Sequence, residues 1–227
     1  MKTKKKKNKR NLTYYFLELM VVFIGVTAGF LLNNWRDDMA ELELERMYLD
    51  SFYSDVKADA VDLDSLIYRT NKKTDTMISI LKKSALIDMP LSEELAKTLV
   101  KEMMYLEWFT PANDTYEDIK NSGNLNLISN YKLKEKISSY YSFQNQVASV
   151  EQYYINHMDN YVFPILYKSY HLLNHEFISQ ESYQSLEFTN MFLGALALLQ
   201  QNIKVYKEVK EKNKEFKNEL IKTLEVE

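Results

Sequence analysis

The sequence predicts an all-α protein in which an N-terminal transmembrane helix is followed by a long helix of an extracytoplasmic antiparallel helical bundle. The 227 residues include only 4 Gly and 3 Pro, too few for the many tight turns of a β-sandwich or β-barrel. Residues 12–32 form an apolar run with a single ionisable side chain, Glu18. Beyond this run, apolar residues recur at the three- and four-residue spacing of amphipathic helices.

Composition excludes several classes of protein. A charged fraction of 27% excludes a protein with many membrane spans, and 46% hydrophobic residues exclude a chain that is disordered throughout. The absence of Cys excludes disulfides, thiolate metal sites, Cys nucleophiles and the lipid-anchor cysteine of bacterial lipoproteins. One anchored helical domain fits the length.

The N-terminal residues predict a basic cytoplasmic tail, residues 1–11, and a transmembrane helix, residues 12–34. Seven of the first ten residues are Lys or Arg, which favours a cytoplasmic N-terminus and contact with anionic lipid rather than nucleic acid. A helix of 21 residues spans about 30 Å, the thickness of the hydrocarbon core. Tyr14 and Tyr15 at one end and Trp35 at the other are typical interfacial anchors.

The rest of the chain, residues 35–227, is then placed outside the cytoplasm. It carries 22 basic and 31 acidic residues, a net charge of −9. We expect a single-pass protein of the inner membrane with a periplasmic C-terminal domain. A cleaved signal peptide is the alternative, but the apolar run is longer than the 7–15 residues of a typical signal sequence.

Three residues of the transmembrane helix predict a contact with another helix. Gly25 and Gly29 form a GxxxG pair, whose spacing lets two helix backbones approach closely in lipid. At 100° per residue Glu18 falls on the same face, and a carboxylate inside a bilayer normally faces protein or water. We expect self-association or a partner membrane protein here. In the alternative, Glu18 reaches the Lys-rich interface and the glycine spacing arises by chance.

The next segment predicts a long helix, because residues 35–87 contain no Gly or Pro. Apolar residues recur every seven positions, as in a coiled coil, and a second row follows four residues later. Whether this helix continues the transmembrane helix or breaks at Asn33-Asn34 stays open. The first row is Leu42, Leu49, Val56, Leu63, Thr70 and Met77, and the second is Arg46, Tyr53, Ala60, Ile67, Thr74 and Leu81.

Turn signals divide the remaining chain into further helices. Pro90 ends the long helix, and Ser92 caps a second one that runs to about residue 107. A third short helix opens at Asn113-Asp114 and closes at Ser122-Gly123, where glycine supplies the left-handed turn. We expect a loop over 124–130 with Leu125, Leu127 and Ile128 turned inward, a helix from Tyr131 that splits at Pro164, a helix over 165–175, and a last helix from residue 190 to about 224.

Sites for chemistry are hard to find in this sequence. His171 and His175 would share one face of a helix beside Glu176, but this ligand set is incomplete, so we expect no metal and no cofactor. GxSxG, Walker and GxGxxG motifs are all missing from the sequence. We therefore expect a protein that is not an enzyme.

Two stretches resemble an uncharacterised family of bacterial single-pass membrane proteins. The first runs from Glu18 through Gly25 to Asn33-Asn34-Trp35, although the family typically has Gln at the position of Leu31 and often Ala at that of Gly29. The second is the segment 115–128, TYEDIKNSGNLNLI, with Tyr140-Tyr141 after it. The resemblance implies the anchored helical architecture and no particular activity. The residues of this motif loop, Ser122, Gly123, Asn124 and Leu125, are explained by a helix end that turns into the bundle, and a binding role for the loop is the alternative.

The sequence therefore favours a non-enzymatic, membrane-anchored scaffold or accessory subunit of the cell envelope that acts through assembly. Its partners would be membrane lipid and either further copies of itself or another membrane protein. The alternative is a ligand-sensing helical bundle that signals through a partner, because helical bundles often bind small molecules between their helices.

Overall fold

The computed structural model describes residues 12–86 and 90–226. These residues are almost entirely helical, with one short two-stranded hairpin, so the predicted all-α class is confirmed. The chain divides into two compact units, the first ending at Met47 and the second beginning at Tyr48, and each is described by itself. The predicted basic tail, residues 1–11, lies outside the described residues.

Helix α1 (Leu12–Leu86) supplies all the described residues of the first unit. Its backbone is helical through Asn33 and Asn34, where the sequence left a break open. The side chains there bond within the helix, because Asn33 Nδ2 donates to Asp37 Oδ2 at 2.9 Å and Arg36 Nη2 donates to Asn33 Oδ1 at 3.0 Å. Both bonds join residues one helical turn apart, so they are compatible with a continuous helix.

The first elements of the second unit lie close to their predicted bounds, although the second helix ends at Met104 rather than near residue 107 and a 3₁₀ turn occupies part of the predicted loop over 124–130. Helix α2 (Glu93–Met104) follows Ser92, whose Oγ accepts the Leu95 N–H at 3.4 Å. Asn130 Oδ1 accepts the Leu133 N–H at 3.2 Å and caps α4 in the same way. Between them lie α3 (Asp114–Asn121) and a 3₁₀ turn, η1 (Asn124–Leu127), and the capped helix is α4 (Tyr131–His157).

The chain after α4 departs from the predicted helices. A π-helical turn, η2 (Met158–Val162), precedes Pro164, which confirms a disruption there. The predicted helix over 165–175 is wrong, because the helix that contains Pro164 ends at Ser169 and a β-hairpin follows. The elements are α5 (Phe163–Ser169), β1 (Tyr170–His171), β2 (Glu176–Phe177), α6 (Gln180–Gln184) and α7 (Leu186–Val226).

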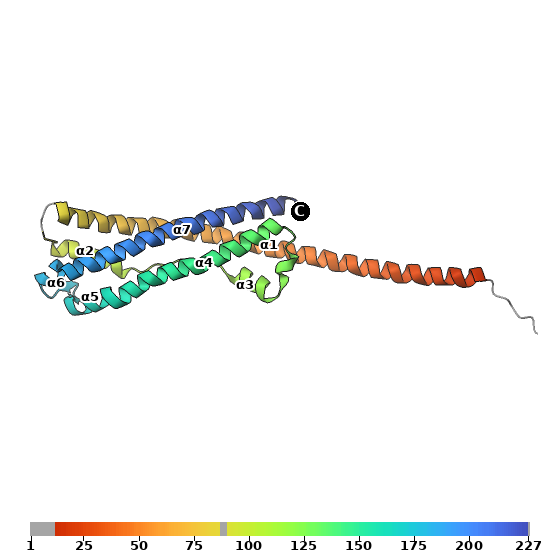
Figure 1. Ribbon diagram of the computed structural model, residues 1–227, viewed down its shortest axis with the longest axis horizontal. Helices are drawn as coiled ribbons and strands as arrows, with labels where there is room; N and C mark the ends of the chain where they lie inside the picture. Colours follow the sequence, from red (N-terminus) through yellow and green to blue (C-terminus); the bar gives the residue numbers. More distant parts are fainter. Residues whose placement is uncertain (1–11, 87–89, 227) are drawn as a thin grey trace, which may run out of the picture. The chain divides into compact units, whose positions relative to one another are not determined.

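Helices α4 and α7 run side by side in opposite directions (Figure 1). Asn130, before α4, donates from Nδ2 to Thr223 Oγ1 at 2.8 Å near the end of α7. At the other end of α4, His157 Nε2 lies 2.9 Å from the Met191 carbonyl oxygen near the start of α7. These two contacts fix the antiparallel register over the full length of α4.

The part of α1 that belongs to the second unit is also antiparallel to α7. Asn213 Nδ2 donates to the Val56 carbonyl oxygen at 2.9 Å, and Lys210 pairs with Asp64 about two turns farther along α1. Residue numbers on α7 fall as those on α1 rise. Three long helical segments therefore share one core, and α2, α5 and α6 gather at one end of it (Figure 1).

The buried face of α1 confirms half of the predicted seam. From Leu49 onward, every residue of the first predicted row is buried. In the second predicted row Thr74 is buried, whereas Tyr53, Ala60, Ile67 and Leu81 are only half-buried. The residues that are buried instead lie three positions after those of the first row. Leu42 and Arg46 are exposed, so the seam begins at Leu49. The buried second row is Phe52, Asp59, Leu66, Lys73 and Ile80.

Candidate functional site

The predicted membrane-contact residues lie on an unobstructed surface of α1. An ideal Cβ built on Gly25 or Gly29 meets no atom within 4 Å. Their spacing of four residues, and that of seven from Glu18, place all three on one helical face as predicted. By length and composition one described helix is apolar enough to cross a membrane, and its most apolar 18-residue window has a mean hydropathy of 2.1 with none of it buried.

The predicted interfacial anchors are solvent-exposed aromatic side chains on the same helix. Tyr14 and Tyr15 are 53% and 50% exposed, and their rings meet edge to face with centroids 6.2 Å apart. Trp35 is 63% exposed. All three rings therefore lie on the surface of α1.

The motif loop is a helix end that the structure ties to α1. Gly123 has a φ of +75°, the left-handed conformation that the sequence predicts for it. The Ser122 N–H and Oγ both donate to the Asp118 carbonyl oxygen, at 2.9 and 2.8 Å. Asn124 Nδ2 donates to the Tyr48 hydroxyl at 3.2 Å, and that hydroxyl donates to Asp118 Oδ2 at 2.9 Å. These hydrogen bonds therefore attach the motif loop to α1.

The inward side chains of the motif also follow the prediction in part. Ile128 is completely buried, whereas Leu125 and Leu127 are half-buried. In α3, the ring of Tyr116 stacks on that of Tyr141 in α4, with centroids 4.2 Å apart and planes 6° from parallel. Side-chain packing thus holds both α3 and η1 against the long helices.

Residues 105–113, which we call the connecting segment, are held by charged side chains of α1 and α4. Asp59 Oδ1 accepts the Ala112 N–H at 2.9 Å, and Glu151 Oε1 accepts the Phe109 N–H at 2.7 Å. Lys73 Nζ donates to the Tyr105 carbonyl oxygen. This segment has no helical hydrogen bonds of its own, so these side chains satisfy backbone groups that burial would otherwise leave unpaired.

Both carboxylates belong to buried hydrogen-bond networks. The Tyr140 hydroxyl donates to Asp59 Oδ2 at 2.6 Å and accepts from Asn213 Nδ2 at 3.2 Å. The Tyr206 hydroxyl donates to Glu151 Oε1 at 2.7 Å. Burial raises the pKa of Asp59 and of Glu151 above their ordinary values, although the hydrogen bonds that each accepts oppose this rise.

These two networks hold the connecting segment against the long helices. Each carboxylate oxygen that is paired accepts from a backbone N–H or a tyrosine hydroxyl, and neither arrangement contains a nucleophile beside a base. The sequence prediction missed these residues. The signal was present, because Asp59 and Lys73 occupy the heptad row three residues after Val56 and Thr70, where a charged residue is unusual.

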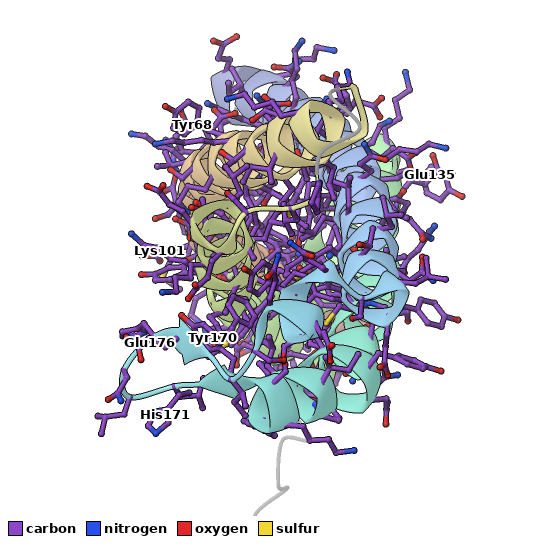
Figure 2. All side chains as sticks on the ribbon, turned by 90° about the vertical axis from the view of Figure 1, so that its left-hand side faces the viewer. Tyr68, Lys101, Glu135, Tyr170, His171 and Glu176 are labelled. Atoms are coloured by element: carbon purple, nitrogen blue, oxygen red, sulfur yellow. The ribbon has the colours of Figure 1, made fainter. Side chains whose placement is uncertain are left out.

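The histidines do not form the helical pair that their spacing suggested. His171 ends β1, and the His175 N–H donates to its carbonyl oxygen at 2.8 Å to close the turn of the hairpin. Figure 2 shows the hairpin at the edge of this end of the unit, with His171 and Glu176 projecting from it. The rings of Tyr170 and Phe177, 4.8 Å apart, stabilise the paired strands in place of a helix.

His175 and His157 each lie among other residues of the second unit. His175 lines a cavity of about 720 Å³ between α2 and the hairpin, together with Lys97 and Lys101. His157 Nε2 bonds the Met191 carbonyl oxygen and its ring lies against Gly194. Within residues 12–86 and 90–226, no three His, Asp or Glu side chains are grouped as metal ligands.

Comparisons with known proteins supply no relative. No protein-family model matches the chain, no curated protein matches it, and no solved structure matches it. The family resemblance of the two sequence stretches therefore stays a prediction.

Proposed function

We propose that the protein is a single-pass, membrane-anchored helical protein of the bacterial envelope that works by assembly rather than by catalysis. In this proposal α1 crosses the inner membrane, the basic tail stays in the cytoplasm, and the second unit is a periplasmic helical bundle. The second unit would present a surface to envelope partners, and the membrane helix would bring copies or partner proteins together.

The observation that carries the proposal is the exposed apolar surface of α1. Fourteen large apolar side chains between residues 14 and 32 are each at least 42% exposed. Burying such a side chain gains about 1.5 kcal/mol, so covering all of them would gain about 20 kcal/mol. A gain of this size favours a lipid or protein environment over water for this surface.

The charge distribution supports the orientation. Seven basic residues precede the apolar run and the remainder of the chain is acidic. A positively charged flank is retained on the cytoplasmic side. We expect a reporter that is active only outside the cytoplasm to be active when it is fused after Glu227, and activity of a cytoplasmic reporter alone would contradict the orientation.

The open face around Gly25 and Gly29 supports assembly through the membrane helix. Changing both to Ile would add bulk where two backbones would touch, so we expect normal insertion and loss of the oligomer in a membrane self-association assay. Glu18→Gln keeps the shape and removes the charge, and we expect a smaller loss because an amide can still hydrogen-bond across the interface. An unchanged oligomer in the double Ile variant would leave the glycine spacing to chance.

A further inference from the structure

The cavity between α2 and the hairpin extends along one face of α2. Its volume is about 720 Å³, within the range of about 300–1,000 Å³ that small-molecule sites occupy. Glu94, Lys97, Lys101 and Met104 line it at the three- or four-residue spacing of a helical face, and together they span about 15 Å of α2. Figure 2 shows α2, which carries Lys101, beside the hairpin, which carries Tyr170. A cavity of this length is suited to an extended chain.

The two ends of the cavity differ in chemistry. Toward the C-terminal end of α2 its wall is apolar, formed by Val100, which is 2% exposed, and by the thioether side chain of Met104. Leu172 adds apolar surface from the hairpin. Toward the N-terminal end its wall is polar, because Lys97 Nζ pairs there with Glu93 Oε1 at 2.8 Å. A cavity that is polar at one end and apolar at the other matches an amphiphile.

The hydroxyl of Tyr170 is a free hydrogen-bonding group of this cavity. The Tyr170 residue lines the cavity and is only 6% exposed. Its hydroxyl has no hydrogen-bond partner among the described residues, yet it is not one of the polar atoms that the fold encloses completely, so a ligand can reach it. Burial raises the pKa of this hydroxyl, and the nearby Lys97 ammonium opposes the rise. The hydroxyl is therefore protonated at neutral pH and can donate to a ligand.

The ammonium group of Lys101 is the uncompensated charge of the cavity. Lys97, one turn away, is neutralised by Glu93 and also lies near Glu176, whereas Lys101 has no ion-pair partner in residues 12–86 and 90–226. Among the described residues that line the cavity, Glu94 alone carries a carboxylate, and it lies about 10 Å from Lys101 along α2. At about one Debye length, its repulsion of an anion at Lys101 is largely screened.

A fatty acid combines these requirements. Its carboxylate accepts hydrogen bonds from an ammonium and a hydroxyl, and its acyl chain gains free energy with every CH₂ group that leaves water. We propose that the cavity binds a fatty acid, whose carboxylate is held by Lys101 Nζ and the Tyr170 hydroxyl and whose chain lies against Val100 and Met104. This inference stands without the membrane proposal, since every residue that it uses belongs to the second unit.

The test uses the full chain in phospholipid vesicles and a palmitate analogue with a photoreactive diazirine on its acyl chain. Peptide mass spectrometry locates the adducts after illumination. We expect saturable adducts within residues 97–105 and 170–175, and unlabelled palmitate should compete them away. Adducts within residues 12–34 report lipid contact of the membrane helix, so failure of the membrane proposal and failure of the cavity proposal remove different adducts.

Two variants test the groups that hold the carboxylate. Tyr170→Phe removes only the hydroxyl and Lys101→Met removes only the charge, and each should weaken half-saturation of the cavity adducts about tenfold, as expected for a hydrogen bond to a charged group. Lys168→Met changes an exposed lysine at a separate cavity and should leave half-saturation unchanged. The melting temperature of unliganded Tyr170→Phe should also stay unchanged, because the hydroxyl bonds no described residue.

Four results would each overturn the proposal. The first is the absence of saturable adducts at the cavity, and the second is unchanged half-saturation in either Tyr170→Phe or Lys101→Met. The third is competition by hexadecanol or lysophosphatidylcholine that equals or exceeds competition by palmitate, because the carboxylate would then not be recognised. The fourth is a clear fall in the melting temperature of Tyr170→Phe, which would mean that the hydroxyl is already bonded within the protein.

Discussion

Gly194 of α7 lies directly against the ring of His157, and replacing it with alanine tests how much this close contact contributes to stability. An ideal Cβ at residue 194 would sit 2.6 Å from His157 Cε1 and 3.0 Å from Nε2, closer than real Cβ contacts allow. The ring would have to move. It would then lose the hydrogen bond from Nε2 to the Met191 carbonyl oxygen and its contact with Tyr161, whose ring centroid is 5.4 Å away.

The expected change in stability follows from three contributions. The hydrogen bond is worth about 1 kcal/mol and the ring contact about 0.5–1 kcal/mol. Alanine in the interior of a helix regains about 1 kcal/mol over glycine. We therefore expect Gly194→Ala to lower the free energy of unfolding by about 1 kcal/mol. In a His157→Ala background the obstruction is gone, and the same substitution should raise it by about 1 kcal/mol.

Urea denaturation of the full chain in detergent, followed by circular dichroism, measures both values. Gly29→Ala serves as the control, because a Cβ there meets nothing within 4 Å and should not change unfolding of the second unit. The reversal of sign between the two backgrounds is the decisive result. A change of the same sign and size in both would refute the close contact between residue 194 and the His157 ring.

Three further substitutions test the fold by the same denaturation measurement. Leu63→Asp places a carboxylate at a completely buried position of the seam and should cost about 3 kcal/mol or more; an unchanged midpoint would contradict the seam. Gly123→Ala should cost about 1 kcal/mol because φ is +75° there, and a gain in stability would contradict the left-handed turn. Burial raises the pKa of Asp59 in the folded state, so its contribution is most favourable below the ordinary carboxyl pKa and is lost as the pH rises through the raised value. Asp59→Asn should therefore lose less stability than the wild type as the pH rises above about 4, the ordinary pKa of an Asp carboxyl, and parallel pH profiles would contradict this.

Much of the fold could be predicted because its signals are local. Ser92 caps a helix through its own side chain, and Gly123 ends one through its own backbone conformation. Each of these residues acts within a few positions of itself, so spacing along the sequence is enough to identify its role.

Asp59 and Lys73 stand out in the sequence as charged residues in an apolar row, but their roles could not be predicted because their partners are distant. Asp59 accepts from Ala112 and Tyr140, which lie 53 and 81 residues away. A charged residue in an apolar row is interpreted as an interruption of the apolar pattern unless its hydrogen-bond partner is known.

The hairpin shows a different limit. Residues 165–175 have no strong helix breaker after Pro164, and the prediction extended the helix accordingly. In the structure the aromatic pair of Tyr170 and Phe177 packs near Phe188 of α7, with ring centroids of Phe177 and Phe188 5.5 Å apart. Burial of these rings outweighs the weak helical preference of a short segment.

The antiparallel placement of α7 sets an order on biosynthesis. Helix α7 leaves the ribosome after α1 and α4, yet Asn213 and Tyr206 supply the partners of buried groups on both earlier helices. Until it is made, the apolar row of α1 from Leu49 to Met77 and the inner face of α4 lack the surface of α7 that covers them. A nascent chain at that stage exposes the apolar, aggregation-prone face of α1, because the part of α7 that covers it is synthesised about 150 residues later. Chaperone contact during synthesis should consequently fall on α1, and ribosome stalling within α7 should leave the emerging protein open to proteolysis.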